Sequence, residues 1–270
     1  MRKGFICAGL LLLSRLCPGQ AKLGDMACVY ITSPNLDSSL AFYEKLGFPK
    51  TAANSFPVEW AQCSDGSLTI MLRKDPEPYI GLTYYCNDID KTVAALEKDS
   101  IVFDKKPSPA DPVKRYYIKS PDGFTVMLVP NIGGFQQPRG TTLLNMPPAD
   151  FAKADKFPNK QCGVFGEFCH PVTDIRKSVA FWSHLGFTVK SMTKVPYPYA
   201  ILSDGLMLIG LHQTRRFNYP AVTYFGINTA SRLQQLSDSG IQDMQEMQGK
   251  NNVVLKTFEG QHFFIFSLGM

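Results

Sequence analysis

An internal repeat constrains the fold of this 270-residue chain more than any other feature of its sequence. Segment 38–48, SSLAFYEKLGF, matches segment 177–187, KSVAFWSHLGF, 139 residues later. The tripeptide Ser-Asp-Gly at 64–66 recurs at 203–205 with the same offset. Independent matches at one offset are typical of duplicated architectures. The chain therefore contains two copies of one structural unit.

Within each copy, the pattern of apolar residues predicts two modules that each contain a strand, a helix and further strands. In the first copy, alternation around Val29–Ile31 predicts a strand, and Asn35 is a candidate N-cap for the helix that follows. The Ser-Asp-Gly at 64–66 predicts a hairpin turn between short strands. The same order of elements starts again at 82–86. We therefore expect an α+β fold of four βαβββ modules in two tandem repeats.

The two repeats are expected to span residues 24–130 and 162–270. The segment between them, 131–161, is punctuated by glycine and proline, which is typical of a linker. It is longer than most connections between elements, so we expect its large apolar side chains to pack against a repeat. These side chains are Phe135, Leu143, Leu144 and Phe151.

Residues 1–21 have the pattern of a secretory signal peptide: a positive start, a short apolar run and small residues at a cleavage site. The apolar run is too short for a membrane-spanning helix, and no later stretch qualifies, so no membrane span is expected. The protein would be periplasmic or secreted if the signal is cleaved. It would be cytoplasmic if translation starts at Met26.

The charge of the chain gives no reason to expect a nucleic-acid partner. The formal net charge is +5, and without the three basic residues of the predicted signal it is +2, from 25 basic and 23 acidic residues. Nucleic-acid binding needs a concentrated basic face. The five cysteines after the signal lack the close spacing of a zinc knuckle or redox motif, so we expect free thiols. Export would nevertheless permit a disulfide.

The order of elements resembles that of the vicinal-oxygen-chelate superfamily, which includes glyoxalase I, extradiol dioxygenases and bleomycin-binding proteins. The resemblance implies curved mixed sheets that enclose a cavity in each repeat. It does not imply a reaction, because function belongs to the site and not to the fold. The segments that carry the resemblance are 35–48, 87–90 and 120–123 in the first copy, and 173–187 with the late turn Glu259-Gly260 in the second.

Metal-using relatives place a His or Gln at the start of a module's first strand and a Glu in its last strand. By this resemblance, the first position is Cys28 in the first copy and Glu167 in the second. The other matching positions hold Gly, Ala, Met or Phe. A divalent ion needs several converging nitrogen, oxygen or sulfur donors. We therefore expect no metal site in the first copy.

The second copy leaves alternatives open. Strand parity places Glu167, His212 and His262 on the cavity face, and one carboxylate with two imidazoles is a common donor set for iron and zinc. Both histidines lie two residues, roughly 7 Å, from the family position. A site for Fe, Zn, Mn or Ni is thus an alternative to no cofactor at all. Otherwise His262 would bond a carbonyl or Glu259, and Glu167 would pair with Arg215 or a lysine.

The other two histidines are expected to have structural roles. His170 shares parity with the helix-packed side of its strand, which predicts a hydrogen-bonded core histidine. His184 lies near the end of a predicted helix, where a solvated or capping role is expected.

Most other cavity positions are apolar or aromatic, with a few hydroxyls and one arginine. Such walls suit an organic ligand held by stacking and a few hydrogen bonds. The alternative is that these side chains fill the space and leave no pocket. The predicted ligand-binding residues are Tyr30, Arg73, Tyr85 and Met127 in the first copy and Cys169, Thr223, Phe225 and Phe264 in the second.

The sequence favours a non-catalytic, metal-free small-molecule-binding protein that acts as a monomer or homodimer, and it identifies no catalytic residue. Two alternatives remain. One is a metal-dependent lyase, isomerase or dioxygenase with its site in the second repeat. The other is a scaffold whose cavities are filled.

Overall fold

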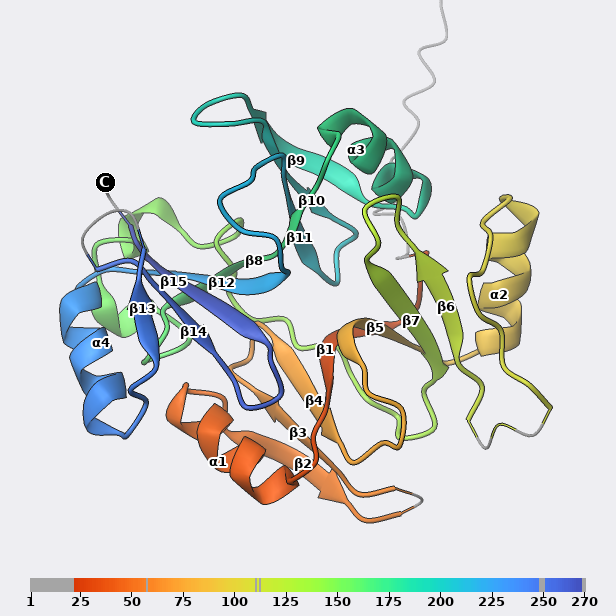
Figure 1. The fold of residues 1–270 in the computed structure, drawn as a ribbon, viewed down its shortest axis with the longest axis horizontal. Helices are drawn as coiled ribbons and strands as arrows, with labels where there is room; N and C mark the ends of the chain where they lie inside the picture. Colours follow the sequence, from red (N-terminus) through yellow and green to blue (C-terminus); the bar gives the residue numbers. More distant parts are fainter. Residues whose placement is uncertain (1–21, 57, 110, 112, 248–250, 269–270) are drawn as a thin grey trace, which may run out of the picture.

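The computed structural model describes residues 22–56, 58–109, 111, 113–247 and 251–268. The predicted signal peptide therefore lies outside the described residues. Two mixed β-sheets, one from each repeat, form the body of the molecule, and the helices lie at its periphery (Figure 1). No helix in the described ranges is long and apolar enough to cross a membrane.

The first repeat forms a seven-stranded sheet in the order β2-β3-β4-β1-β5-β7-β6. Helices α1 (Leu36–Lys45) and α2 (Ile89–Lys98) follow the first strand of each module. The strands are β1 (Met26–Thr32), β2 (Lys50–Asn54), β3 (Trp60–Ser64), β4 (Thr69–Arg73), β5 (Ile80–Cys86), β6 (Tyr116–Lys119) and β7 (Thr125–Pro130).

The second repeat forms an eight-stranded sheet in the order β13-β14-β15-β12-β8-β11-β10-β9. Its helices are α3 (Ile175–His184) and α4 (Thr229–Asp238). The strands are β8 (Val164–Pro171), β9 (Thr188–Thr193), β10 (Tyr199–Ser203), β11 (Leu208–His212), β12 (Ala221–Gly226), β13 (Met244–Glu246), β14 (Val253–Lys256) and β15 (His262–Ser267).

Strand pairing joins the two modules of each repeat into one sheet. The first strands of the modules pair antiparallel, β1 with β5 and β8 with β12. Each of them also pairs in parallel with the last strand of its own module. In the second module of the first repeat, the strand expected before β6 is reduced to a bridge between Lys105 and Tyr117. The arrangement confirms the expected α+β fold of tandem repeats.

Local sequence signals explain where the first helix of each repeat begins. Asn35 is the N-cap of α1, and its side chain accepts a hydrogen bond from the backbone N–H of Ser38. Asp174 caps α3 in the same way, accepting from the backbone N–H groups of Arg176 and Lys177. These caps satisfy amides that have no partner within the helix.

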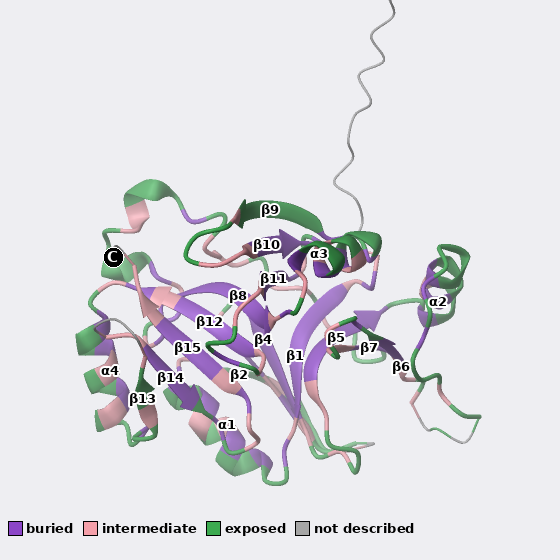
Figure 2. Ribbon diagram, turned by 45° about the horizontal axis from the view of Figure 1, so that its top comes forward, coloured by how far each residue is buried: buried purple, intermediate pink, exposed green. Residues whose placement is uncertain are grey.

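Alternate residues of the central strands face two different clusters, which is why these strands are buried along their length (Figure 2). Val29 and Ile31 of β1 belong to the main core, which is shared by both repeats. Cys28 and Tyr30 belong to a second cluster on the opposite face of the first sheet. The side-chain parity predicted from the sequence is therefore confirmed for this strand.

Reciprocal hydrogen bonds join the two repeats. The Tyr84 hydroxyl on β5 donates to Asp204, with 2.5 Å between the oxygens, and the Tyr224 hydroxyl on β12 donates to Asp65. Asp65 and Asp204 are the equivalent residues of the repeated Ser-Asp-Gly turns. Burial raises the pKa of both carboxyl groups. The shared core continues around these bonds, where Phe48 contacts Tyr224 edge-to-face.

The connection between the repeats packs against the sheets. Three of the four large apolar side chains that were expected to do so are packed. Phe135 contacts Trp60 and Tyr85 with ring centroids 5.2 and 5.1 Å apart. Leu143 and Phe151 pack on a small cluster formed around Phe157, Met146 and Val164. Leu144 differs from the expectation, because its side chain remains 43% exposed.

The five cysteines of the described residues are free thiols, and all of them are buried. The expectation of free thiols is confirmed by this arrangement. Burial raises the pKa of each thiol above its usual value, which keeps the groups protonated and unreactive.

Removal of either hydrogen bond between the repeats should lower the stability of the protein. Tyr84→Phe leaves the buried carboxyl group of Asp204 without one of its donors and should lower the free energy of unfolding by about 1–3 kcal/mol. Tyr224→Phe should lower the free energy of unfolding by a similar amount, because it removes a donor from Asp65. Tyr116→Phe is the control, since Tyr116 is half-buried and packs on Phe103. Equal urea midpoints for all three variants would contradict the prediction.

Candidate ligand-binding site in the second repeat

A pocket of about 560 Å³ lies on the second sheet, on the face opposite the main core. This volume is within the range of pockets that hold small organic molecules. All four ligand-binding residues predicted for this repeat line it, namely Cys169, Thr223, Phe225 and Phe264. The other lining residues are Glu167, Tyr197, His212, Arg216, Phe217, Met247, Asn252, Phe266 and Ser267.

Strand register brings the polar and aromatic parts of the pocket together. Thr223 on β12 lies opposite Glu167 on β8 and beside Phe264 on β15. Paired residues of neighbouring strands point to the same face of a sheet. Phe264 and Phe266 are two residues apart on β15, and their rings stack with centroids 5.4 Å apart. The pocket therefore has an aromatic wall next to a carboxylate.

Glu167 is paired with a histidine at the edge of the pocket. His212 Nε2 donates to Glu167 Oε1 over 2.6 Å. Glu167 is only 4% exposed, and its second oxygen, Oε2, has no hydrogen-bond partner among the described residues. A buried carboxylate oxygen without a donor is costly. The lysine or Arg215 expected as a partner from the sequence is replaced by His212.

Gly210 provides the room for this carboxylate. A Cβ atom at this position on β11 would lie 2.0 Å from Glu167 Oε2. Any side chain here would therefore displace the carboxylate from its position. By the family resemblance, Gly210 is one of the glycines that stand at a metal-ligand position, whereas in the structure it accommodates Glu167.

Aromatic side chains hold His212 in place. The Tyr197 hydroxyl lies 3.1 Å from His212 Nδ1, and the Tyr199 ring stacks on the imidazole with centroids 5.0 Å apart. Phe217 contacts the imidazole from another side. Burial, followed by the charge of Glu167, raises the pKa of Tyr197. The Glu167 carboxylate, the imidazole and the phenol form a continuous chain of hydrogen bonds.

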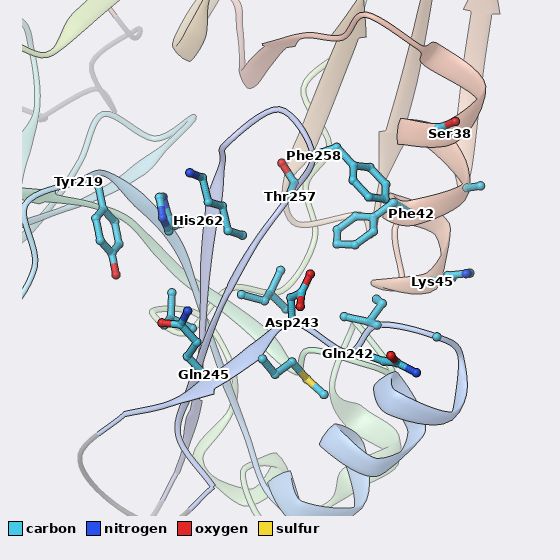
Figure 3. A pocket seen from close by; sticks show the side chains of 17 residues that line it. Ser38, Phe42, Lys45, Tyr219, Gln242, Asp243, Gln245, Thr257, Phe258 and His262 are labelled. Atoms are coloured by element: carbon cyan, nitrogen blue, oxygen red, sulfur yellow. The ribbon is translucent and has the colours of Figure 1, made fainter.

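His262 does not join this group. It stacks on Tyr219, with ring centroids 3.7 Å apart, and lines a separate groove (Figure 3). The far wall of that groove holds Phe42 from α1 and Phe258 from the turn before β15. The expected contact between His262 and Glu259 is not formed either, because Glu259 bonds Ser39 and Thr257.

The donor set does not fit a metal site with three protein ligands. No group of three or more His, Cys, Asp or Glu side chains that could hold a metal ion occurs within the described part of the chain. Glu167 and His212 supply two donors, and these bond to each other. Protein sites for zinc and similar ions have three or four protein ligands.

The corresponding face of the first sheet is largely filled by its own side chains. Tyr30, Tyr85 and Met127 are buried in one cluster, which the linker residue Phe135 covers. Arg73, the fourth residue predicted here, instead lines a pocket of about 300 Å³ beside this cluster. Of the four predicted residues of the first repeat, Arg73 therefore lines a pocket, and the other three lie in the cluster.

The two structural histidines lie as expected, with one difference. His170 is buried among Phe124, Phe168 and Trp182, but neither ring nitrogen has a hydrogen-bond partner among the described residues. Burial, and then the charge of His212, lowers its pKa to about 3. His184 is exposed near the end of α3 and its Nε2 contacts the carbonyl oxygen of Asp99.

The sequence assigns no role to two of the residues that shape the pocket, and it places a third, Tyr197, only on a less certain strand near the cavity. Arg216 and Phe217 come from the loop between β11 and β12, where no periodic pattern indicates a direction for side chains. Tyr197 lies just before β10. The one signal in the sequence that could have indicated these loop residues is composition, since residues 214–219 combine two arginines with two aromatic residues.

Comparison with known proteins agrees with the duplicated fold. Residues 25–128 match the sequence model of the Glyoxalase/Bleomycin resistance protein/Dioxygenase superfamily. The 2,3-dioxygenase LapB from Pseudomonas sp. KL28 superposes with a TM-score of 0.54 at 14% identity, covering 90% of this chain and 91% of that chain. Homoprotocatechuate 2,3-dioxygenase from Arthrobacter globiformis gives 0.56 at 13% identity, covering 92% and 80%. No curated protein sequence matches.

The fold and the family match define the class of protein. It is an α+β protein of two tandem repeats, with a ligand-sized pocket on its second sheet. Residues 25–128 match the model of the glyoxalase/bleomycin resistance/dioxygenase superfamily, so the resemblance seen in the sequence is confirmed by the family model for the first repeat. At 13–14% identity, the likeness to the dioxygenases shows the fold alone.

The close approach at Gly210 predicts a coupling between two substitutions. Gly210→Ala should lower the free energy of unfolding by about 1–3 kcal/mol, because the added methyl group collides with Glu167. In a Glu167→Ala background, the same change should cost less than about 0.5 kcal/mol. Denaturant unfolding of both single variants and the double variant measures the coupling. Additive effects would contradict the predicted collision.

The lowered pKa of His170 predicts that the protein loses stability in acid. Its pKa of about 3 in the folded protein lies below the ordinary histidine value of 6.5, so the unfolded chain binds more protons between these values. Stability should therefore fall as the pH is lowered from about 6 to 4, by up to about 1.4 kcal/mol per pH unit. His170→Leu should reduce this slope, while His184→Gln, at an exposed position, should leave it unchanged. Equal slopes in both variants would be evidence against the assignment.

Proposed function

We propose that the protein binds a small apolar or aromatic organic molecule in the pocket of its second repeat, and that it does so without a metal ion. The observation that carries the proposal is the combination of a ligand-sized volume with walls formed by Phe217, Phe225, Phe264 and Phe266. Aromatic walls bind planar organic molecules by stacking and by removing apolar surface from water.

The polar groups of the pocket would orient such a ligand. Glu167 and His212 lie at one end, and Arg216 lies at the pocket with its guanidinium 5.6 Å from the Tyr197 ring. A mainly apolar pocket with a few placed polar groups is typical of sites that select one orientation of a small molecule. The first repeat would then serve mainly as a structural partner.

A second candidate is a metal-dependent lyase, isomerase or dioxygenase with its site in the same pocket. It is favoured by the pairing of Glu167, at the family's metal-ligand position, with a histidine. The donor set described above argues against it. No catalytic step is derived for this candidate, because the side chains present do not complete a three-ligand site.

Boundaries and location form part of the same proposal. We infer repeats at 24–130 and 162–270 joined by 131–161, and a signal peptide at 1–21 that would be removed on export to the periplasm or medium. The protein would act as a monomer or homodimer without nucleic acid. The mass of the mature protein tests the cleavage.

The binding proposal predicts that aromatic compounds raise the melting temperature of the purified protein and bind with one-site behaviour. Phe266→Ala should weaken binding about tenfold, because a stacking surface is removed. Phe258→Ala is a matched control, since Phe258 is 72% exposed and lies outside the pocket. Equal weakening in both variants, or no binding by any aromatic compound, would contradict the proposal.

Metal content separates the two candidates. After incubation with iron, zinc, manganese and nickel and then desalting, the binding proposal expects far less than one equivalent of each metal. Near-stoichiometric metal that disappears in Glu167→Ala would replace the metal-free proposal by the enzyme candidate.

A further inference from the structure

A smaller pocket, of about 300 Å³, lies in the first repeat where two arginines come together. Arg73 is the last residue of β4, and Arg115 directly precedes β6, although β1, β5 and β7 separate these strands in the sheet. Asp75, in the loop after β4, links the two arginines. Its carboxylate accepts two hydrogen bonds from Arg115 and lies 3.7 Å from Arg73 Nε. One carboxylate therefore serves two guanidinium groups.

The two arginines differ in their hydrogen bonds. Arg115 donates to Asp75 from both terminal nitrogens, Nη1 and Nη2. Arg73 donates no hydrogen bond to the described residues: its Nε is buried without an acceptor, and 3.7 Å is too long for a hydrogen bond to Asp75. The Nη groups of Arg73 are not among the buried nitrogens, and 14% of its side chain is exposed. The Nη groups, and not Nε, are therefore the donors that a ligand in the pocket can reach.

The charges of the pocket balance in number. Asp75 is the innermost acid, since its side chain is 1% exposed, and it accepts hydrogen bonds from Arg115 and from the Tyr30 hydroxyl. Its hydrogen-bonding capacity is thus directed to groups other than Arg73. The charged lining residues are Arg73, Lys105 and Arg115 with Asp75, Glu77 and Asp111.

The two remaining acids are also bonded elsewhere. Both oxygens of Glu77 accept from Lys105, at 3.3 and 3.2 Å, and Asp111 accepts from the backbone N–H of Ser108. Both acids are exposed, so water and salt screen their charges. Arg73 is therefore the cation of this pocket whose donors lack an acceptor among the described residues.

The rest of the pocket indicates the size and polarity of a ligand. Its other lining residues are Val58, Pro76, Val113 and Tyr117, which are apolar apart from one hydroxyl. A guanidinium presents a planar fork that binds the two oxygens of a carboxylate through parallel hydrogen bonds. A volume of about 300 Å³ is at the lower end of the range for small-molecule sites. A carboxylate on a short apolar body matches both the fork and the walls.

We propose that this pocket binds a small organic carboxylate, whose oxygens accept hydrogen bonds from the Nη groups of Arg73 and whose apolar body contacts Val58, Pro76 and Val113. The site lies in the first repeat, so it is separate from the aromatic pocket of the proposed function and does not depend on it. The first repeat then has a binding role in addition to its structural one.

Three probes test the proposal in saturation-transfer NMR titrations of the full chain at constant ionic strength: butyrate, butyramide and inorganic phosphate. Butyrate and butyramide have the same apolar body and nearly the same shape, but only butyrate is charged. Butyrate should bind about tenfold or more tightly than butyramide. It should also bind more tightly than phosphate, which leaves the apolar walls in water. Equal binding of butyrate and butyramide, or tighter binding of phosphate, would overturn the proposal.

A substitution assigns the effect to Arg73. Arg73→Gln removes the charge and should weaken butyrate binding about tenfold, while butyramide binding within about twofold of the wild type shows that the pocket remains folded. Arg176→Gln is the matched control, because Arg176 is exposed on α3 and should leave both affinities unchanged. Butyrate binding that persists in Arg73→Gln would place butyrate elsewhere, for example beside Arg216, and would contradict the proposal.

A second substitution keeps the test decisive if Arg73→Gln fails to fold. Arg73→Lys retains the charge but loses the planar fork, so butyrate should bind severalfold more weakly than to the wild type and still be preferred to butyramide. Butyrate affinity equal to that of the wild type would contradict recognition by the fork. None of these outcomes affects the aromatic pocket of the second repeat, which Phe266→Ala tests separately.

Discussion

The reciprocal hydrogen bonds from Tyr84 to Asp204 and from Tyr224 to Asp65 are the interaction on which the arrangement of the two repeats depends. Each carboxylate also accepts backbone N–H groups of its own hairpin turn. Because a buried carboxylate is stable only with such donors, the turn of one repeat is tied to the central strand of the other. The two sheets therefore bury one face in a shared core and leave the other face for separate clusters.

Duplication provided two equivalent faces, and side-chain volume made them different. On the first sheet, Tyr30 and Tyr85 fill the space and Phe135 from the linker covers it. On the second sheet, the linker packs against Val164 and Phe225 at one end, and a pocket of about 560 Å³ remains beside Thr223. The two copies thus differ in how this face is filled, although their elements follow the same order apart from the one strand that the first repeat lacks.

The pair of Glu167 and His212 gives the pocket its chemical character. One carboxylate oxygen of Glu167 accepts a hydrogen bond from His212, and the other is buried without a partner among the described residues. The aromatic residues around His212 hold this geometry in place. The fold is shared with dioxygenases, but the function depends on the side chains of the site and not on the fold.

The sequence alone determined the repeat, all but one of the expected strands and the two faces of β1 and β8, because these depend on local periodicity and on matches within the chain. It therefore identified Cys169, Thr223, Phe225 and Phe264 at the pocket. Tertiary structure decided the rest. The bond between Glu167 and His212, the position of His262 against Tyr219, and the filling of the first sheet depend on strand register and loop packing, which bring together residues distant in the sequence.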